Sequence, residues 1–551
     1  MKNKLLSLLT LVFLLTACAP ATPAPPTVTP LPPTPIPAET GPWWNGQVFY
    51  EIFVRSFNDS NGDGIGDFNG ITAKLDYLND GDPNTTTDLG VTGIWLMPIF
   101  PSPSYHGYDV TDYYSVNPQY GTMDDFKNLL QEAHKRGIHV IIDMVLNHTS
   151  DKHPWFKSAK SDANSPYRDW YIWSDADPKY SGPWGERVWH PSTTGYYYGI
   201  FESFMPDLNY ENPAVTQEME KVSAFWLKDV GVDGFRLDAA KHLIEDGTQQ
   251  QNTQATHEWF KGYRMAYKAD NPNALTVGEI SGDNDKTLAS YTSGDQLDLV
   301  FDFNLATAFI GSANSGKATP AVTALKISST LMPEGQYAPF LSNHDQDRVM
   351  FTLGNNTGKA KVAASLLLTS PGTPFLYYGE EIGMIGFKPD ENIRRPMQWS
   401  AEKNAGFTTG KPWRSVASDY DTVNVEAQMV DPDSLWSHYQ ALISLRNAHP
   451  ALRSNETAFA KSGSSAVFAS IRSRDGENIL VLINLGADPV KGYTISLDKS
   501  ALPAGQYSLI SLMGGDAANP LNVSSQGGFK NFAPTLELPP FSTYIFQLKG
   551  E

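Results

Sequence analysis

Gly234-Phe-Arg-Leu-Asp-Ala-Ala-Lys-His242 begins as a short apolar run and continues into polar residues. Its first five residues have the composition of a β-strand, on which Arg236 and Asp238, two positions apart, lie on the same face. The Arg236 guanidinium would keep the Asp238 carboxylate ionised and oriented. Because a buried unpaired acid is costly, a strand that ends in such a pair is a candidate for a functional site.

Three further apolar runs end in polar residues of the same kind. They end in Asp143-Met-Val-Leu-Asn147-His148, Gly278-Glu279 and Asn343-His344-Asp345. Any one of these acids could be a structural ion pair or a helix cap. Polar clusters at four separate strand ends make that explanation poor for the whole set, and they favour one shared active site.

The β-type runs begin at about Trp43 and alternate with helical patterns such as 123–136 and 215–230. Eight runs separated by helices predict an α/β fold, a (β/α)8 TIM barrel, with its active site at the carboxyl ends of the strands. The runs are 48–54, 93–97, 140–145, 234–238, 276–279, 299–303, 340–343 and 375–378.

Two parts of the chain depart from this alternation. Residues 149–206 are rich in Trp, Tyr, Pro, Asp and Gly and too long for a simple connection, so they predict a domain inserted after the third strand. The barrel would then occupy 43–148 and 207–452. The final part, 453–551, predicts a C-terminal antiparallel β-sandwich. Its strand-like runs are 466–472, 478–484, 493–497 and 544–548.

The N-terminus resembles a bacterial lipoprotein signal. Lys2 and Lys4 precede the apolar run 5–15, which is too short to span a membrane, and Cys18, the chain's one cysteine, follows. We expect residues 1–17 to be cleaved and Cys18 to be lipidated, which would anchor the protein on the extracellular side of a bacterial membrane. An ordinary signal peptide with an incidental cysteine is the alternative. Residues 18–42, dominated by Pro, Thr and Ala, would form an extended linker.

The composition limits the partners of the chain. Asp and Glu number 60 and Lys and Arg 41, which gives a net charge of −19. Without a basic cluster, this charge argues against nucleic acid and against anionic membrane surfaces as partners. We expect a monomer.

Carboxyl groups on separate strand ends suit the hydrolysis of a glycosidic bond. That reaction needs a proton for the leaving oxygen and stabilisation of an oxocarbenium-like centre. One carboxyl group must stay protonated near neutral pH while another stays ionised. Asp238, beside Arg236, suits the ionised nucleophile. Glu279 follows an apolar strand, so burial could raise its pKa and let it serve first as acid and then as base.

These residues also carry a resemblance to the α-amylase family, glycoside hydrolase family 13, from about Gln47 to the C-terminus. The resemblance implies a retaining double displacement at α-glucosidic bonds. Asp238 would be the nucleophile, Glu279 the general acid and base, and Asp345 the residue that stabilises the distorted sugar. The four ordered family motifs correspond to DMVLNH (143–148), GFRLDAAKH (234–242), GE (278–279) and SNHD (342–345).

The resemblance also implies which residues hold the sugar at the cleaved bond. His148 and His344 would hydrogen-bond it, and Tyr108 of HGYD (106–109) would stack on it beside Arg236. The insert would be the family's domain B, and the sandwich its domain C.

One calcium site is arguable from the residues themselves. The loop Asp59-Ser-Asn61-Gly-Asp63-Gly-Ile65-Gly-Asp67 places oxygen ligands at alternate positions between glycines, and hard oxygen ligands suit Ca²⁺. The resemblance adds the carbonyl of Ile65 to the ligands. A polar Asx turn without metal is the alternative.

A second calcium site is implied by the resemblance alone. In many family members this ion ties domain B to the barrel, and the matching positions are Asn147, Asp207 and the carbonyl of His242. Lys241 leaves an arrangement without metal open, since members that lack this ion often place a lysine nearby.

Substrate choice is also implied by the resemblance. The segment Met205-Pro-Asp207-Leu-Asn209 lies between the forms found in oligo-1,6-glucosidases and neopullulanases, and a small residue at Ala239 accompanies α-1,4 preference. We expect an α-amylase that cleaves internal α-1,4 bonds of starch and maltooligosaccharides outside the cell. The segment 394–399 resembles α-glucosidases, so an exo-acting or transglycosylating enzyme is the alternative. A non-catalytic starch-binding lipoprotein is the third hypothesis.

Aromatic residues gather in the predicted insert, at Trp184, Trp189 and Tyr196-Tyr197-Tyr198. Flat rings stack on sugar faces, so these side chains could build outer sugar subsites. They could equally form the insert's own core, and the sequence does not separate the two.

Overall fold

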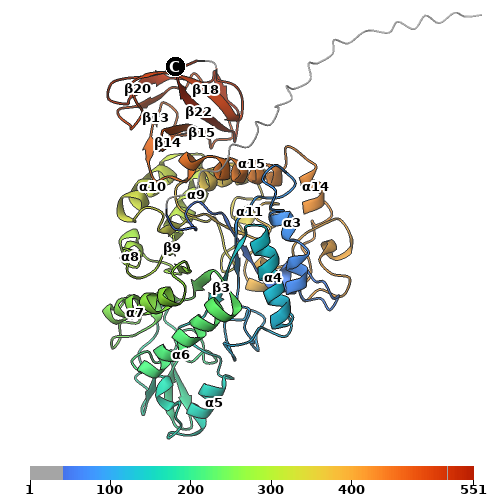
Figure 1. The fold of residues 1–551 in the computed structure, drawn as a ribbon, viewed down its shortest axis with the longest axis vertical. Helices are drawn as coiled ribbons and strands as arrows, with labels where there is room; N and C mark the ends of the chain where they lie inside the picture. The colour runs from blue at the N-terminus through green and yellow to red at the C-terminus, as the bar shows by residue number, and fades with distance from the viewer. Residues whose placement is uncertain (1–40, 518) are drawn as a thin grey trace, which may run out of the picture.

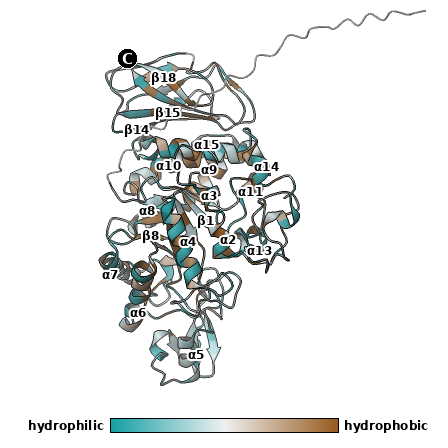
Figure 2. Ribbon diagram, turned by 45° about the vertical axis from the view of Figure 1, so that its right-hand side comes forward, coloured by the Kyte–Doolittle hydropathy of each residue, from teal (hydrophilic) through white to brown (hydrophobic). Residues whose placement is uncertain are grey.

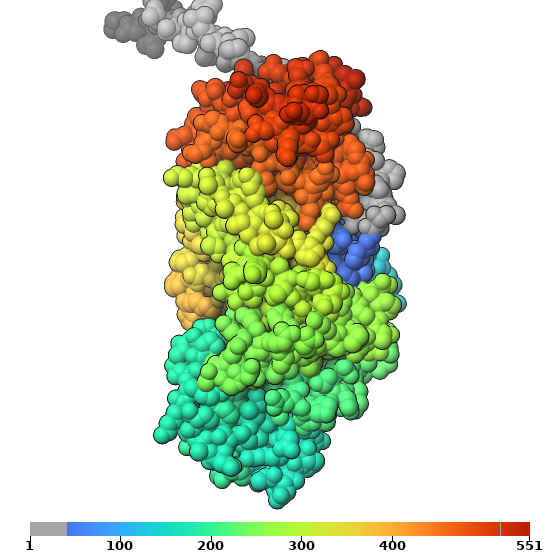
Figure 3. Space-filling model, turned by 90° about the vertical axis from the view of Figure 1, so that its left-hand side faces the viewer, coloured from blue at the N-terminus to red at the C-terminus, as the bar shows by residue number. Residues whose placement is uncertain are grey.

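The computed structural model describes residues 41–517 and 519–551. The predicted signal peptide, Cys18 and nearly all of the predicted linker therefore lie outside the described residues. The described chain forms three bodies in a row (Figures 1 and 3), with a barrel in the middle, a sheet-rich C-terminal body at one end and the segment between β3 and β7 at the other. Within the described ranges, no helix combines the length and apolar character needed to cross a membrane.

The middle body is a barrel of eight parallel strands, which confirms the predicted fold class. Neighbouring strands follow the order β10-β9-β8-β7-β3-β2-β1-β11, and a bridge between Phe340 and Phe375 closes the ring. The strands are β1 (Phe49–Ile52), β2 (Gly93–Leu96), β3 (His139–Met144), β7 (Gly234–Leu237), β8 (Leu275–Gly278), β9 (Leu299–Phe301), β10 (Tyr337–Ala338) and β11 (Phe375–Tyr377).

The seventh barrel strand is not where the sequence predicts it. β10 covers Tyr337–Ala338 rather than 340–343, and only Phe340 of the predicted run pairs with a neighbour. Pro339 accounts for the difference, because proline has no N–H to donate to the ladder, and its carbonyl accepts a bond from Phe375. The residues that follow form a loop at the strand ends, and this loop carries Asp345.

Strand alternation divides the barrel interior into two layers. At one end the inward positions are apolar, and Phe49 on β1 and Ile141 on β3 belong to a buried cluster there. Two positions further along the same strands lie Glu51 and Asp143, with Arg236 of β7 paired beside Asp143. All three charged side chains are buried. An apolar floor thus supports an ionic layer at the carboxyl ends of the strands, where barrel active sites lie.

Amphipathic helices cover the outside of the barrel. In α4 (Met123–Lys135), Thr122 and Asp125 form a capping box, Phe126 and Leu129 are buried, and the outer face is hydrophilic (Figure 2). The predicted helix 215–230 ends as a π-helical turn, η2 (Phe225–Val230). The other long helices are α6 (Pro213–Ala224), α7 (Gln254–Asp270), α9 (Phe303–Ser315), α10 (Thr319–Leu331), α12 (Thr357–Leu368) and α15 (Leu435–Ala448).

The segment after β3 folds as an insert around a small antiparallel sheet in the order β4-β6-β5. Trp189 and Tyr198 are buried in the insert's own apolar cluster, and Tyr197 is buried in the main cluster. These three aromatic residues are therefore core, whereas Trp184 is exposed. The elements are α5 (Pro154–Ser161), β4 (Trp173–Ser174), β5 (Trp189–Ser192) and β6 (Gly195–Tyr198).

The C-terminal body is an antiparallel sandwich. Its strand β15 packs against the barrel with one face and against the sandwich core with the other. Leu480 and Leu482 lie in the sandwich core, whereas Ile479, Val481 and Ile483 belong to the main cluster that includes the barrel helices. The large sheet has the order β12-β14-β15-β22-β18-β19. Its strands are β12 (Thr457–Phe459), β14 (Val467–Arg474), β15 (Glu477–Asn484), β18 (Gly505–Met513), β19 (Leu521–Val523) and β22 (Thr543–Gly550). Smaller sheets are formed by β13 (Lys461–Ser462), β17 (Ile495–Leu497) and β20 (Phe529–Phe532), and by β16 (Val490–Lys491) and β21 (Glu537–Leu538).

Candidate active site

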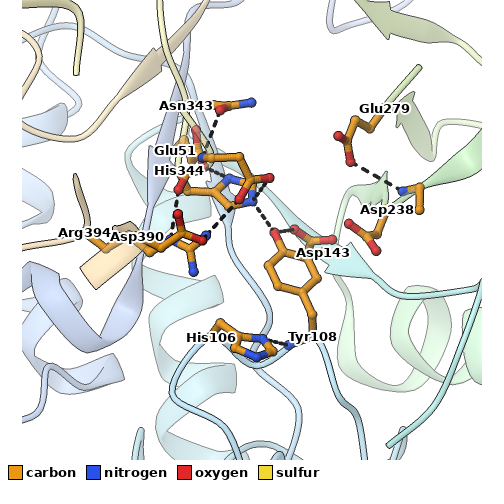
Figure 4. A network of polar contacts seen from close by, with 12 residues as sticks. Glu51, His106, Tyr108, Asp143, Asp238, Glu279, Asn343, His344, Asp390 and Arg394 are labelled. Carbon is orange, nitrogen blue, oxygen red and sulfur yellow. Dashed lines mark hydrogen bonds and ion pairs between the residues drawn. The ribbon is translucent and has the colours of Figure 1, made fainter. Parts of the chain in front are cut away.

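Polar side chains converge at the carboxyl ends of the barrel strands (Figure 4). Asp143 and Arg236 lie within β3 and β7, and Asp238 and Glu279 directly follow β7 and β8. Asp345 lies on the loop after β10. The structure thus brings the three predicted acids to one site, although they are far apart in the sequence.

Arg236 joins the acids of this site. The side chain is 1% exposed, and its Nη1 donates to Asp238 at 2.7 Å and to the two oxygens of Asp143 at 2.9 and 3.0 Å. Its Nη2 donates to Glu279 at 2.6 Å. One guanidinium therefore contacts both carboxyl groups that are predicted to act on the bond. The distance between the bonded oxygens of Asp238 and Glu279 is therefore at most the sum of these two hydrogen bonds and the separation of Nη1 from Nη2.

Burial and the positive charge of Arg236 have opposite effects on the pKa values of Asp238 and Glu279. Removal from water raises the pKa of Glu279, Arg236 opposes that rise, and the nearby Asp238 carboxylate adds to it. Burial likewise raises the pKa of Asp238 against the pull of Arg236. Because two like charges held by one guanidinium repel each other, the pair favours one proton shared between the two groups. A general acid beside an ionised nucleophile needs this protonation state.

Asp345 lies in a cationic setting beside His344 and Arg394, and Arg394 lies across the site from Asp238 and Glu279 (Figure 4). It accepts a hydrogen bond from Nη2 of Arg394 at 2.8 Å and forms an ion pair with His344, whose Nε2 lies 3.2 Å away. Partial desolvation in the site would raise the pKa of Asp345, but His344 and Arg394 outweigh this effect and hold the pKa well below its ordinary value. Asp345 is therefore ionised, and its side chain is 47% exposed, which leaves it open to a ligand.

A buried chain of hydrogen bonds fixes the ring of Tyr108. Burial would lower the pKa of His344, but the carboxylates of Asp345 and Glu51 raise it to about 9. The protonated ring donates from Nδ1 to Glu51 at 2.6 Å and from Nε2 to the Tyr108 hydroxyl at 2.6 Å. That hydroxyl donates to Asp143 at 3.0 Å, and the Tyr108 and His344 rings stack with their centroids 5.5 Å apart.

His148 contacts the backbone of the same tyrosine and is neutral. Burial lowers the pKa of His148 to about 4, and its Nε2 donates to the carbonyl of Tyr108 at 3.2 Å. His148, His344 and Tyr108, the residues expected to hold the sugar, are thus assembled around one segment.

Three residues of the site received no role from the sequence. The sequence predicts polar segments that include Asp143 and Arg394 but no role for either residue, and it predicts no role for Glu51. A signal for Glu51 was present, since it is the one acid inside an otherwise apolar strand, as Asp143 is in β3. No comparable signal marked Arg394, because it reaches Asp345 from a loop 49 residues further along the chain.

The predicted calcium loop lies apart from these acids and packs against the segment around Thr408, whose hydroxyl donates to Asp59. Oxygens of Asp59, Asn61 and Asp63 each accept a backbone N–H two positions further on, the last of them from Ile65. These oxygen donors are of the type that Ca²⁺ takes. The carboxylate of Asp67 accepts backbone N–H bonds from Ser60 and from Gly70 of α2 (Phe68–Thr72), and that of Asp59 accepts three, so both acids already bind the loop backbone.

The second predicted metal site joins the barrel to the insert. Nδ2 of Asn147 lies 3.3 Å from Asp207 and 2.8 Å from the carbonyl of His242, so the three expected ligands are adjacent. Burial, and next the neighbouring Glu245, raise the pKa of Asp207 well above its ordinary value. Lys241 does not neutralise the carboxyl groups of Asp207 and Glu245, because its Nζ is bonded to Ser281 and Asp283.

More carboxylates without a cationic partner lie around this second site. Both oxygens of Glu186 and Oε1 of Glu245 are buried with no hydrogen-bond partner among the described residues. Together with Asp207, these acids help raise the pKa of the buried Tyr198 hydroxyl, so they lie near one another. Within the described ranges, no group of three or more His, Cys, Asp or Glu side chains is arranged to hold a metal ion by itself. A cation here would also need the Asn147 amide and the His242 carbonyl.

Comparison with known proteins agrees with this geometry. The family model described as the α-amylase catalytic domain matches residues 51–455. Alpha-amylase 3 of Dictyoglomus thermophilum is 42% identical over 448 residues, which is 81% of this chain and 85% of that protein. The oligo-1,6-glucosidase of Parageobacillus thermoglucosidasius is 34% identical over 80% of this chain and 90% of that protein.

Solved structures show the same architecture. The crystal structure of α-amylase from H. orenii matches with a TM-score of 0.80 at 42% identity and covers 92% of this chain and 100% of that one. The trehalulose synthase of Pseudomonas mesoacidophila matches with a TM-score of 0.77 at 30% identity and covers 93% and 100%. A barrel whose strand ends bring these acids together, and a family model that spans most of the chain, show that this protein belongs to the α-amylase family, glycoside hydrolase family 13.

Proposed function

We propose that this glycoside hydrolase is an α-amylase that cleaves internal α-1,4 bonds of starch and maltooligosaccharides with retention of configuration. One observation carries the proposal: the Arg236 guanidinium contacts both Asp238 and Glu279, and the ionised Asp345 is bonded to Arg394, which lies on the opposite side of the site (Figure 4). A retaining enzyme holds its two carboxyl groups about 5–5.5 Å apart and uses one of them as nucleophile, and we assign that role to Asp238 because Arg236 holds its carboxylate.

In the proposed first step, an Asp238 oxygen attacks C1 of the glucosyl unit while the bond from C1 to the leaving oxygen breaks. Glu279 gives its proton to that leaving oxygen. Asp345 binds the distorted sugar, and its negative charge stabilises the developing oxocarbenium ion. Arg236 keeps Asp238 aimed at C1.

In the second step, Glu279, now ionised, takes a proton from water, whose oxygen attacks C1 and releases the Asp238 carboxylate. Two inversions at C1 restore the α configuration. Tyr108 offers a stacking face for this sugar, and the chain through His344 to Glu51 holds that face in place.

The α-amylase assignment is supported by the small residue Ala239 next to Asp238 and by the higher identity to proteins named α-amylase, 42% against 34% for an oligo-1,6-glucosidase. An exo-acting α-glucosidase is the second candidate, because Arg394, from the segment that resembles α-glucosidases, contacts Asp345. A maltoheptaoside blocked at its non-reducing end separates the two. Steady release of products supports the α-amylase, and no release supports the exo-enzyme.

A third hypothesis, a starch-binding protein without activity, is tested with Asp238→Asn. Wild type that hydrolyses soluble starch beside an inactive variant supports the enzyme. Equal and negligible hydrolysis by both would support the binding protein. The complete set of acids and Arg236 argues for the enzyme.

We also propose that the protein binds Ca²⁺. At the junction of barrel and insert, Asn147, Asp207 and the His242 carbonyl would hold one ion, with Glu245 close by. At the loop, Asp59, Asn61, Asp63, Asp67 and the carbonyl of Ile65 would hold another. Bound Ca²⁺ would neutralise buried carboxylates and stabilise local structure, and it takes no part in the chemical steps.

A further inference from the structure

Trp184 differs from the other aromatic residues of the insert. Its side chain is 61% exposed, whereas Trp189, Tyr197 and Tyr198 are buried. A tight turn presents it, with Gly182 accepting from Gly185 at 3.0 Å and donating to the carbonyl of Glu186 at 2.9 Å. A large apolar ring held out on a structured turn is not explained by packing of the insert core.

One face of Trp184 is supported from behind. Its ring stacks on Phe201 with centroids 5.7 Å apart at 30°, and it lies 5.5 Å from the ring of His242. Phe201 in turn lies 5.5 Å from the ring of His148. The exposed tryptophan is therefore linked through one ring to a residue expected to bind the sugar at the cleaved bond.

These contacts place Trp184 on the leaving-group side of the site. His242 is on the segment that follows Asp238, and the adjacent Lys241 is bonded to Ser281, two residues beyond Glu279. Glu279 protonates the leaving oxygen in the proposed mechanism, so the leaving sugar lies on its side. Arg394, which is bonded to Asp345, lies across the site from Asp238 and Glu279 (Figure 4).

The turn is also fixed to the barrel rather than free. Ser181 and Arg187 pair as a bridge at its base, and Gln250, from the segment after β7, donates to the Ser181 carbonyl at 3.4 Å. A ring already held in place loses little conformational freedom when a ligand stacks on it, which favours binding.

We propose that Trp184, backed by Phe201, is the stacking platform for a glucosyl unit on the leaving-group side, and that it directs transfer of the bound glycosyl group to a second sugar. The proposal rests on the retaining mechanism proposed above. A sugar on this platform places a hydroxyl where water would otherwise attack. Its oxygen bonds to C1, the bond from C1 to Asp238 breaks with the electron pair returning to the carboxylate, and Glu279 takes the hydroxyl proton. One glycosidic bond is lost and one is formed, so no other reactant is needed.

The test compares wild type with Trp184→Ala, Trp184→Tyr and a control, Phe204→Ala. Phe204 is also exposed on the insert, and no ring contact links it to a described residue. Two donors are used. Maltohexaose occupies the leaving-group side, and α-maltosyl fluoride leaves that side empty, since its leaving group is fluoride.

We expect Trp184→Ala to raise KM for maltohexaose about fivefold and to lower the ratio of transfer to hydrolysis by a similar factor, because aromatic stacking contributes about 1 kcal/mol. We expect kcat/KM for α-maltosyl fluoride to stay near that of wild type. Trp184→Tyr restores the transfer ratio in large part, and Phe204→Ala leaves every value unchanged.

Two outcomes would overturn the platform. One is a transfer ratio and KM in Trp184→Ala that stay within about twofold of wild type. The other is an equal loss with both donors, which would make Trp184 a structural residue. A wild type that cleaves α-maltosyl fluoride no faster than Asp238→Asn would instead refute the proposed function, whatever the platform does.

Discussion

Among single residues, Arg236 determines most of the chemistry of the site. It lies inside the barrel, on an inward position of β7, with Asp143 of β3 as its buried partner. Burial raises the pKa of Asp143 to about 7, and the Arg236 guanidinium opposes that rise. The ends of the same guanidinium reach Asp238 and Glu279, so one cation sets the position of both groups.

The pH profile should report the raised pKa of Glu279. A general acid works when protonated, so a pKa raised by burial keeps Glu279 active at higher pH than an exposed glutamate, whose pKa is about 4.3. We expect kcat/KM for maltohexaose to fall at alkaline pH as Glu279 loses its proton. With α-maltosyl fluoride, which needs no proton on its leaving group, that fall should move to higher pH. Identical alkaline limbs for the two donors would contradict the role of Glu279.

At the scale of elements, the strand ends were the most predictable part of the molecule. Apolar runs marked the strands, and polar residues after them marked the site, because both signals are local in the sequence. The predicted position of β10 was wrong. The apolar run 340–343 predicts a strand there, but Pro339 restricts its pairing with the neighbouring strands, and β10 lies before the proline. Contacts such as His344 with Glu51, which are 293 residues apart, could not be read from the chain, since only the closed barrel brings them together.

The junction of β3, the insert and the segment after β7 should depend on a cation. We expect Ca²⁺ at 100 times its Kd to stabilise the protein by about 2.7 kcal/mol and to raise Tm, because it relieves buried, unpaired carboxylates. Asp207→Asn should lose the part of this response that comes from the junction, whereas Asp63→Asn, in the loop, should keep that part. Calorimetry with and without a chelator measures both. A Tm of the Asp207→Asn protein that still rises as in wild type would place the cation elsewhere.

The whole molecule depends on the attachment of the sandwich to the barrel. Arg472 of β14 is buried, and its guanidinium donates to the carbonyls of Thr369, just after α12, and of Ser454. Arg472→Ala would leave both carbonyls without this donor, at a cost of about 3 kcal/mol in the free energy of unfolding. Lys491→Ala, on an exposed ion pair of the sandwich, should change it by less than about 1 kcal/mol. Denaturant unfolding compares them, and equal effects would show that the Arg472 contacts do not hold the two bodies together.

The location of the protein is tested at its N-terminus, outside the described residues. We propose that lipid on Cys18 holds it at the outer face of a membrane, with the linker as spacer. Cys18→Ser should move the activity from the membrane fraction to the soluble one and leave kcat unchanged, because Cys18 precedes the whole catalytic body. If the variant stays in the membrane fraction, another feature anchors the protein.

The central claim, that Asp238 is the nucleophile opposite Glu279, is tested most directly by trapping the intermediate. A 5-fluoro-α-maltosyl fluoride should label wild type, and mass spectrometry of a digest should find one added glycosyl group on the peptide that contains Asp238. We predict that label on Asp238 and none in Asp238→Asn. A label on another acid, or inverted product with no trapped enzyme, would contradict the account.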